Sequence, residues 1–348
     1  MEMPPGEAEL CTAQECLARL QIPFGALSAL AGTQLVLTGG TGFFGKWLLS
    51  ALGRLNEQGT PVMVTVVSRS PEAFLRHFPS YRQATWLSWL RADLGTVDAL
   101  RLPPADFVIH AAADSSGQAQ ADRHRYAASL LRGAMAVFDA AGRAGARRVL
   151  LTGSGAQYGV RQGPVREDHR GAPLSHLPTS LYAEGKRMVE TLAAIAGERY
   201  GYDVISTRCF AFAGPWLPLN GHFAFGNFIR DALQAPHIRV NSAGTAQRSY
   251  LAGADLAVWL LLLLLRGEAG QPYNVGSDQS LSIRDLAGRI GHLLAPDKAI
   301  QFAETDQACP VADCYVPDIT KARSLGLEVW TTLDTVIHDS ARAAGTLP

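Results

Sequence analysis

The sequence predicts an α/β fold: a doubly wound parallel sheet with helices on both faces, followed by a smaller C-terminal lobe. From Gln34 onward, short apolar runs alternate with longer stretches of helical spacing, a pattern typical of parallel strands joined by helices. The runs are apolar almost throughout, as expected for strands that are covered on both faces. They occupy residues 35–38, 62–67, 107–110, 148–152 and 204–208.

The pattern changes after residue 215. Pro215 and Pro218 predict a loop over residues 216–220, because proline fits neither a helix interior nor a central strand. A helix is expected after this loop, because apolar residues recur there at helical spacing. The residues predicted to share its apolar face are Phe225, Phe228, Ile229 and Leu233.

Three parts are therefore expected along the chain. Residues 1–30 would be an N-terminal extension packed on the domain, and residues 31–213 a dinucleotide-binding domain. Residues 214–348 would form mainly a substrate-binding lobe. Segments 239–241 and 273–275 are predicted to be strands, so the first domain would regain strands from about 238–275.

Composition argues against several classes of partner. The 348 residues are 47% hydrophobic and 18% charged, an ordinary balance for a globular protein. Lysine plus arginine equals aspartate plus glutamate at 31 each, so no excess charge indicates nucleic acid or a membrane surface. The apolar run 256–265 is shorter than the ~20 residues of a membrane span and predicts a buried helix segment.

The cysteines favour a reducing compartment, because five is an odd number in a chain of this length. Two pairs, at 11 and 16 and at 309 and 314, share a spacing, but no histidine cluster lies nearby and no metal site is expected. The N-terminus is acidic where a secretory signal would be basic. We therefore expect a cytoplasmic protein.

A glycine-rich turn follows the first predicted strand. Gly39 permits the tight turn, Gly42 allows the backbone to approach a pyrophosphate, and Gly45 lets the following helix pack close to the strand. The helix N-terminus adds unpaired N–H groups and a partial positive charge. This arrangement is typical of a Rossmann-type dinucleotide site. The predicted cofactor contacts in the turn are Gly39, Thr41, Gly42, Phe43, Phe44 and Gly45.

The end of the second strand bears on the choice of cofactor. An acidic residue here would bind the adenosine ribose of NAD, but the sequence has Ser68, Arg69 and Ser70. A guanidinium flanked by hydroxyls suits a 2′-phosphate, which favours NADP(H) over NAD. The alternative is an exposed Arg69 in an NAD-binding protein.

Two later strand ends also contribute candidates for the cofactor site. Asp93 and Leu94 follow the third strand, where the carboxylate could bind the adenine amino group or simply form a turn. Ala111 and Ala112 follow the fourth strand and would line the same site.

The candidate catalytic residues are Ser154, Tyr182 and Lys186. Tyr182 and Lys186 lie at i and i+4 on one helix face, and their proximity predicts a lowered tyrosine pKa. The phenol could then act as a general base or acid. Ser154 lies just past a strand end, where its hydroxyl could bind the same substrate oxygen. Both Tyr182 and Lys186 are also expected to touch the cofactor.

These residues resemble the extended short-chain dehydrogenase/reductases, and within them the nucleotide-sugar epimerase/dehydratase branch. The resemblance covers roughly residues 33–325. It rests on the glycine turn, His110-Ala111-Ala112, Tyr158-Gly159, Tyr182 with Lys186, Arg208-Cys209-Phe210, Gly214-Pro215, Arg248-Ser249-Tyr250, Asp255 and Tyr273-Asn274-Val275-Gly276. The resemblance implies a bound nicotinamide nucleotide that takes hydride from a sugar carbon, usually C4.

The same resemblance implies the substrate contacts. Arg248 would contact the substrate diphosphate, and the segment 222–229, including Asn227, would line the nucleotide pocket. Without the resemblance, His222 is simply a loop histidine. The tyrosine helix of the family usually packs against its copy in a second subunit, so a homodimer is expected.

The chain departs from the family at informative positions. Sugar 4,6-dehydratases carry an acid pair after the serine or threonine, and sugar-acid decarboxylases a glutamate, where this chain has Gly155 and Ala156. Neither residue can exchange a proton. Ala211 replaces an asparagine common after the sixth strand, and Ser129 replaces a helix asparagine. These last two changes leave the detailed substrate contacts open.

Three functions are compatible with these residues. The leading hypothesis is a nucleotide-sugar 4-epimerase, in which Tyr182 takes the proton of the C4 hydroxyl and hydride returns to the other face of a rotated 4-keto sugar. The runner-up is an NADPH-consuming ketoreductase of a keto-sugar or another small carbonyl, which Arg69 favours. A non-catalytic dinucleotide sensor would be expected to lose Tyr182 or Lys186, and both are present.

Overall fold

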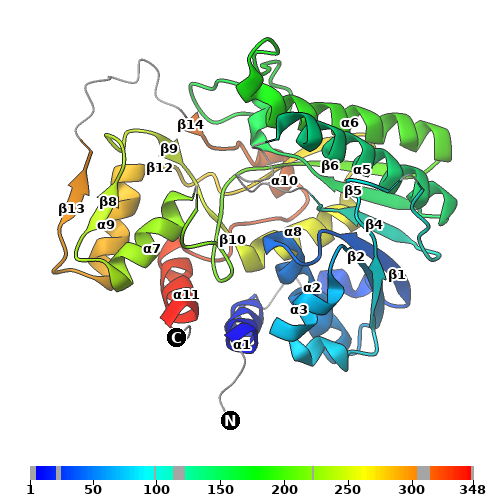
Figure 1. Ribbon diagram of the computed structural model, residues 1–348, viewed down its shortest axis with the longest axis horizontal. Helices are drawn as coiled ribbons and strands as arrows, with labels where there is room; N and C mark the ends of the chain where they lie inside the picture. Colours follow the sequence, from blue (N-terminus) through cyan, green and yellow to red (C-terminus); the bar gives the residue numbers. More distant parts are fainter. Residues whose placement is uncertain are drawn as a thin grey trace.

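A parallel sheet lies at the centre of the molecule (Figure 1). Its strands are β1 (Thr33–Thr38), β2 (Val62–Ser68), β3 (Leu87–Arg91), β4 (Phe107–His110), β5 (Arg148–Thr152), β6 (Asp203–Cys209) and β11 (Pro272–Val275). The seven strands run in the order β11-β6-β5-β4-β1-β2-β3, all parallel. The order reverses direction at β1, which confirms the predicted doubly wound α/β fold. The computed structural model describes residues 5–20, 25–97, 99–112, 122–221, 223–303 and 314–345.

Helices cover both faces of this sheet. On one face, α5 (Arg123–Arg143) and α6 (Leu181–Tyr200) bury side chains such as Val36, Val108 and Val149. On the other, α2 (Phe43–Glu57), α3 (Pro71–His77) and α8 (Gly253–Arg266) cover the alternate positions of the same strands. Because both sets of alternate positions are buried, the strands read as continuous apolar runs in the sequence.

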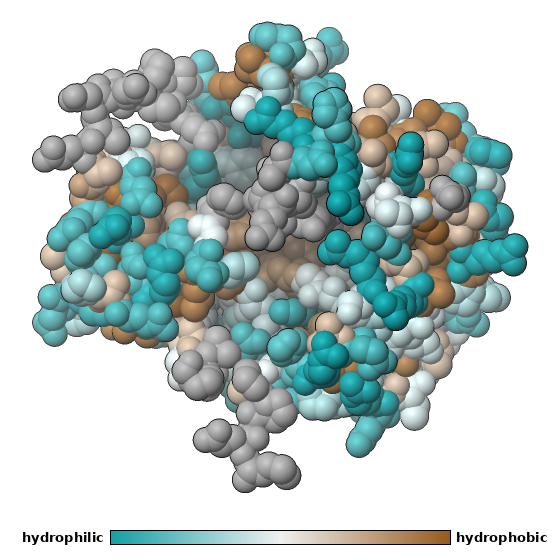
Figure 2. Space-filling model, viewed as in Figure 1, coloured by the Kyte–Doolittle hydropathy of each residue, from teal (hydrophilic) through white to brown (hydrophobic). Residues whose placement is uncertain are grey.

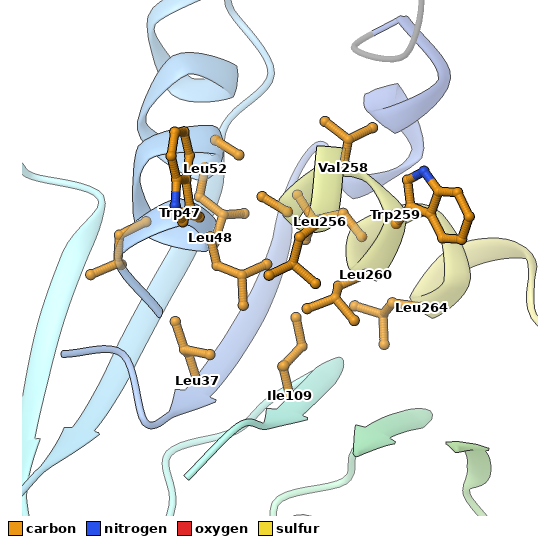
Figure 3. Close-up of a cluster of buried hydrophobic side chains, with 14 of the residues drawn as sticks. Leu37, Trp47, Leu48, Leu52, Ile109, Leu256, Val258, Trp259, Leu260 and Leu264 are labelled. Atoms are coloured by element: carbon orange, nitrogen blue, oxygen red, sulfur yellow. The ribbon is translucent and has the colours of Figure 1, made fainter. Parts of the chain in front are cut away.

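The longest apolar run of the sequence forms the middle of α8. Residues 256–264 are all buried, and the indole of Trp259 donates a 2.8 Å hydrogen bond to the carbonyl of Glu328. Figure 3 shows this helix packed against Trp47, Leu48 and Leu52 of α2. The prediction of a buried helix segment is therefore confirmed. No helix in the described parts of the chain is long and apolar enough to cross a membrane.

The smaller lobe has its own core beside the carboxyl edge of the sheet. It is built from α7 (Ala224–Gln234), β8 (Ile238–Val240), α9 (Ile283–Leu294), β13 (Ile300–Phe302) and α11 (Leu333–Gly345). Short strands connect the two parts: β7 (Phe212–Ala213) pairs with β10 (Leu251–Ala252), and β9 (Gln247–Arg248) lies between β12 (Leu281–Ser282) and β14 (Cys314–Tyr315). Single-turn elements are η1 (Gly25–Leu30), η2 (Pro79–Arg82), η3 (Gly155–Tyr158), η4 (Pro178–Ser180) and α10 (Thr320–Arg323).

Two sequence expectations in this region need correction. The strand expected at 239–241 is β8, and it pairs with β13 rather than with the central sheet, whereas β11 does join the central sheet. The helical spacing places Leu233 on the buried face of its helix, yet it is 38% exposed while Phe225, Phe228 and Ile229 are buried. The helix turns Leu233 away from the lobe core near its C-terminal end, so only the first three side chains reach that core.

The N-terminal residues form α1 (Pro5–Ala18), which packs against α2, α8 and α11. Ala13 and Leu17 are fully buried in this contact. Its Cys16 thiol donates to Asp339 at 3.2 Å, and burial together with that carboxylate raises the pKa of Cys16 to about 12. Within the described ranges, the cysteines at 11, 16 and 209 are free thiols.

Candidate active site

The predicted site residues meet at the carboxyl edge of the sheet. Neighbouring strands end in register there: Thr38 of β1 lies beside His110 of β4, and His110 lies beside Leu151 of β5. The glycine turn, Ala111 and Ser154 each continue from one of these strand ends. Figure 2 shows a hollow on this face of the molecule, between the smaller lobe and the part that carries the sheet. In parallel α/β sheets, ligands bind at this edge.

The glycine turn is shaped to receive a diphosphate. Gly39 has a φ of 73°, and a Cβ there would lie 2.5 Å from the carbonyl oxygen of Ala111. A Cβ at Gly45 would overlap the backbone of Gly39 and Gly40. Gly42 is the exposed N-cap of α2, and no side chain caps that helix. The first N–H groups of α2 are thus left for a ligand, with Thr41, Phe43 and Phe44 around them.

The end of β2 presents the residues predicted to choose between NAD and NADP. Ser68 is buried and its hydroxyl accepts the N–H of Ser70 at 3.2 Å, whereas Arg69 and Ser70 are exposed. Asp93 accepts the N–H of Gly95 at 3.0 Å, so its carboxylate closes the turn after β3 that also contains Leu94. Arg69 therefore stands at the surface where a ribose phosphate could reach it.

A buried histidine, His110, ends β4 beside the glycine turn. The Thr38 hydroxyl and His110 Nδ1 are 2.8 Å apart, and the N–H of Ala112 donates to the same hydroxyl at 3.3 Å. Burial, reinforced by the Lys186 charge, lowers the pKa of His110 to about 3. The Thr38 hydroxyl thus bonds both to neutral His110 and to the N–H of Ala112. The motif draws attention to His110, but nothing in the sequence predicts this positioning role.

Lys186 and Tyr182 both project from α6 toward the end of β5. Lys186 is only 4% exposed, and its ammonium donates to the carbonyl of Thr152 at 2.8 Å. Burial lowers the pKa of Lys186 to about 8. Burial also raises the pKa of Tyr182, while hydrogen bonding to Ser154 opposes that rise. The predicted lowering of the tyrosine pKa by Lys186 is therefore wrong for the protein alone, because desolvation of the phenolate is the largest influence and raises the pKa.

Ser154 is held rigidly just beyond β5. Its hydroxyl accepts the N–H of Ala156 at 3.2 Å, and its own N–H donates to Gln157 Oε1 at 2.7 Å. Gln157 in turn donates to Glu190 at 2.6 Å, and Glu190 forms an ion pair with Arg208 at 2.7 Å. A chain of polar contacts thus ties the serine to both α6 and β6.

Tyr315 also reaches this serine, which the sequence does not predict. Its Oη lies 3.3 Å from Ser154 Oγ and 3.3 Å from the carbonyl oxygen of Cys209. Tyr315 belongs to β14, 161 residues from Ser154 in the chain, and no local motif marks it. Only the return of the C-terminal strands brings the two hydroxyls together.

The structure has no space for an acidic side chain at position 155. A Cβ at Gly155 would lie 2.8–2.9 Å from carbons of the Phe210 ring. Phe210 is itself buried and packs on Tyr158 and Tyr315. An acidic side chain at 155 would therefore require the aromatic cluster to move.

The two predicted substrate residues lie in different surroundings. Arg248 follows Gln247 in β9, donates to the Gln247 carbonyl at 2.8 Å and stands 5.8 Å from the ring centre of Tyr315. Asn227 is in α7 and donates to Gly221 at 3.0 Å. The structure brings Arg248 close to the catalytic group, whereas Asn227 stays within the smaller lobe. His222 falls outside the described residues.

A separate polar cavity of about 310 Å³ lies behind η3, against α6. Its charged walls neutralise one another, since Arg187 pairs with Glu184 and Arg208 with Glu190. The chemistry described above lies at the strand ends, so we assign no ligand to this cavity. In the described ranges, no three histidine, cysteine or acidic side chains gather as a metal site would need.

Curated proteins similar to this chain are UDP-glucuronic acid decarboxylases. Decarboxylase 2 of Arabidopsis thaliana is 29% identical over 300 residues, which cover 84% of this chain and 64% of that protein. Decarboxylase 1 of Xenopus tropicalis is 31% identical over 193 residues, which cover 56% of this chain and 45% of that protein. The chain thus spans about half to two thirds of the length of these relatives.

Solved structures of similar fold include two epimerases. The UDP-N-acetylglucosamine 4-epimerase of Methanobrevibacter ruminantium, determined with UDP-N-acetylmuramic acid, matches with a TM-score of 0.78 and 20% identity over 91% of this chain and all of that one. The UDP-glucuronic acid 4-epimerase of Bacillus cereus, determined with UDP-glucuronic acid and NAD, matches with a TM-score of 0.75 and 19% identity over 90% of this chain and all of that one.

A family model also matches more than half of the chain. It is described as the NAD dependent epimerase/dehydratase family and it matches residues 35–276, from the first strand of the sheet to the end of the last. The matched span contains the glycine turn, Ser154, Tyr182 and Lys186. This chain belongs to the NAD dependent epimerase/dehydratase family.

Proposed function

We propose that the protein is a nucleotide-sugar 4-epimerase that works through a bound nicotinamide nucleotide. The observation that carries the proposal is the convergence of Ser154, Tyr182 and Lys186 at one strand edge, beside Gly155 and Ala156. The first three residues are sufficient for oxidation and reduction at a carbon that bears oxygen. The last two offer no carboxyl group for a dehydration or a decarboxylation.

The contrast with the decarboxylases rests on the surroundings of Gly155. Phe210 fills the space that a side chain at 155 would enter. Ser154 caps the N-terminus of η3 through Ala156 and Gln157, and neither of these residues supplies an acid. These contacts favour an epimerase over a decarboxylase, even though the curated relatives of about 30% identity carry the latter name.

Each residue has a distinct proposed task. Tyr182 accepts the proton of the C4 hydroxyl and later returns it to the same oxygen. Ser154 binds that oxygen and orients it toward Tyr182. Lys186, held by the Thr152 carbonyl, contributes a positive charge and a donor for the cofactor ribose. When bound, the oxidised nicotinamide supplies the hydride acceptor and a positive charge that offsets the raised pKa of Tyr182.

The cofactor is proposed to lie with its diphosphate on the N-terminus of α2. The Gly39 and Gly45 contacts support this position, because neither site has room for a side chain. Ser68, Arg69 and Ser70 would surround the adenosine ribose, and Ala111 and Ala112 would line the middle of the cofactor. Arg69 favours NADP(H), although the B. cereus structure of similar fold holds NAD.

Arg69 supports a second candidate function, which requires a direct test. If NADP(H) is the cofactor, the protein could be a ketoreductase that consumes NADPH and reduces a keto-sugar or another small carbonyl. The raised pKa of Tyr182 keeps the phenol protonated at neutral pH, which suits proton donation to a carbonyl oxygen.

The active form is proposed to be a homodimer that pairs through α5 and α6. These helices pack on each other and expose Met135, Met188 and Ile195 at 50%, 49% and 55%. Met188 and Ile195 lie two turns apart on one face of α6, and exposed apolar side chains of this kind are typical of an interface. A second copy of the chain is the occupant that the resemblance implies.

The experiment that tests the function uses purified protein and a panel of UDP-, dTDP-, GDP- and CDP-sugars, including uronic acids and 4-keto forms. Each sugar is incubated with and without NADPH, and products are followed by mass and chromatography. A new sugar of unchanged mass, formed without added cofactor, supports the epimerase. Reduction that consumes NADPH supports the ketoreductase, and a product lighter by carbon dioxide would show that the family decarboxylation is carried out without the missing acid.

A further inference from the structure

We propose that Tyr315 is a positioning residue that donates its hydroxyl proton to Ser154 and so frees the Ser154 proton for the substrate oxygen. This inference rests on the proposed role of Ser154 at the C4 oxygen. Its basis is the contact between the two hydroxyls, 3.3 Å apart, and the second contact of Tyr315 with the Cys209 carbonyl, also 3.3 Å.

The available protons limit what these groups can do at one time. The Cys209 carbonyl can only accept, and Tyr315 and Ser154 each carry one hydroxyl proton. Ser154 Oγ already accepts the N–H of Ala156, so one further lone pair and one proton remain to it. Two arrangements of the remaining hydrogen bonds are therefore possible.

In the first arrangement, Tyr315 donates to the Cys209 carbonyl and accepts the proton of Ser154. The Ser154 proton is then not available to a substrate. In the second arrangement, Tyr315 donates to Ser154, and Ser154 donates its own proton to the substrate oxygen. The second arrangement serves both the alcohol, whose own proton goes to Tyr182, and the ketone. The change between them requires only rotation of two hydroxyl groups, and no proton leaves the protein.

The surroundings of Tyr315 hold its ring in place while leaving the hydroxyl to rotate. Phe210 packs on the ring with centroids 4.9 Å apart, and the Arg161 guanidinium lies 4.7 Å from the ring centre. Arg161 is itself fixed by bonds to the carbonyls of Gly155 at 2.7 Å and Cys314 at 3.1 Å. Burial raises the pKa of Tyr315 to about 12, so the phenol keeps its proton at neutral pH.

Tyr315 also connects Ser154 to the proposed diphosphate contact. In the strand pairing of β14 with β9, Tyr315 is the register partner of Arg248. The Arg248 guanidinium lies 5.8 Å from the Tyr315 ring centre. Binding of a diphosphate at Arg248 would therefore act on the same strand pair that holds the Tyr315 hydroxyl against Ser154.

The test is a double-mutant cycle of Tyr315→Phe and Ser154→Ala, measured on a sugar that the wild-type protein interconverts. Tyr315→Phe should lower kcat about tenfold, the effect of one lost hydrogen bond to a reacting group. In the Ser154→Ala background, Tyr315→Phe should lower kcat less than twofold, because Tyr315 would act only through the serine. A purely structural role would reduce kcat by the same factor in both backgrounds, and that result would overturn the proposal.

The matched control is Tyr202→Phe, which removes a tyrosine hydroxyl that bonds to a backbone carbonyl at 3.3 Å, between α5 and β6 and away from Ser154. It should leave kcat within twofold of wild type. If Tyr315→Phe also leaves kcat within twofold, Tyr315 does not position the serine.

An independent measurement does not require turnover. 3-Fluorotyrosine placed at position 315 should change its ¹⁹F chemical shift on Ser154→Ala, because the fluorine lies next to the hydroxyl on the ring. Ser340→Ala, which alters a buried hydroxyl in α11, should leave the shift unchanged. If the sugar panel shows no turnover, the proposed function fails, and the shift alone then decides whether Tyr315 and Ser154 are in contact. An unmoved resonance overturns the inference.

Discussion

The ammonium of Lys186 donates a 2.8 Å hydrogen bond to the carbonyl of Thr152, the last residue of β5. This bond ties the N-terminal part of α6 to the strand that leads to Ser154. It also buries a positive charge, since Lys186 is 4% exposed and faces no acidic partner among its described hydrogen bonds. The site is therefore held in place at a cost to stability.

Replacing Lys186 should stabilise the fold while removing activity. Burial lowers the Lys186 pKa from 10.5 to about 8, so the unfolded chain binds more protons between these values. The buried charge destabilises the folded state in full below pH 8, and this destabilisation is relieved as pH rises from about 8 to 10.5. It reaches about 3 kcal/mol. By urea unfolding at pH 7, Lys186→Met should be more stable than wild type by roughly 1–2 kcal/mol. The gain is smaller than the full penalty because the Thr152 carbonyl loses its hydrogen-bond donor.

The pH dependence provides the check on this prediction. Wild-type stability should rise relative to Lys186→Met from pH 8 to 10.5. A variant less stable than wild type at pH 7 would show that the hydrogen bond outweighs the desolvation of the charge.

His110 should make the protein sensitive to acid. Its pKa falls from 6.5 to about 3 on folding, so the unfolded chain binds the extra proton between these values. Stability contributed by neutral His110 is complete above pH 6.5 and is lost as pH falls toward 3. As pH falls from 6.5 toward 3, the free energy of unfolding of His110→Asn should fall less steeply than that of wild type, by about 1.4 kcal/mol per pH unit. Urea unfolding of both proteins from pH 7 to 4 tests this, and parallel curves would contradict it.

Arg69→Ala should separate the two cofactors. If Arg69 binds the 2′-phosphate, the Kd for NADP⁺ should rise by about 10- to 100-fold, as expected for a hydrogen bond to a charged group. The Kd for NAD⁺ should stay within twofold. Arg76→Ala, an exposed arginine in the neighbouring α3, is the control. Titration by protein fluorescence measures both constants, and an equal change for NAD⁺ and NADP⁺ would remove the argument for NADP(H).

Gly45 should tolerate no side chain. Gly45→Ala would place a methyl group on the backbone of Gly39 and Gly40, so cofactor binding should be lost and the Tm should fall. Gly288→Ala is a matched control, because Gly288 also lies in a helix and a Cβ there would meet no other part of the chain within 4 Å. That control should be neutral or stabilising by up to about 1 kcal/mol. Cofactor binding by Gly45→Ala with wild-type affinity would contradict the proposed diphosphate position.

Charge on the exposed face of α6 should dissociate the proposed homodimer. Met188→Asp with Ile195→Asp would bury two carboxylates at the interface, and the dimer Kd should rise at least about 100-fold. Leu233→Asp, an exposed apolar residue on α7, should leave the dimer intact. Size-exclusion chromatography with light scattering reports the mass. A monomeric wild-type protein would refute the homodimer directly.

The sequence by itself determined the fold class and the positions of the proposed site residues along the chain. Apolar runs of strand length separated by helical spacing are local patterns. Because the strands are buried on both faces, they are apolar almost throughout and can be recognised without any long-range information. The glycine turn is equally local, because Gly39 and Gly45 are required by contacts within one strand, turn and helix. Tyr182 and Lys186 share a helix face through their spacing alone.

The tertiary structure decided what surrounds these residues. Burial, rather than proximity to Lys186, sets the direction of the Tyr182 pKa. Segments distant in the chain bring Tyr315 to Ser154, close Phe210 over Gly155 and pair β8 with β13. Desolvation and long-range pairing depend on how the whole chain packs, and no local spacing records them.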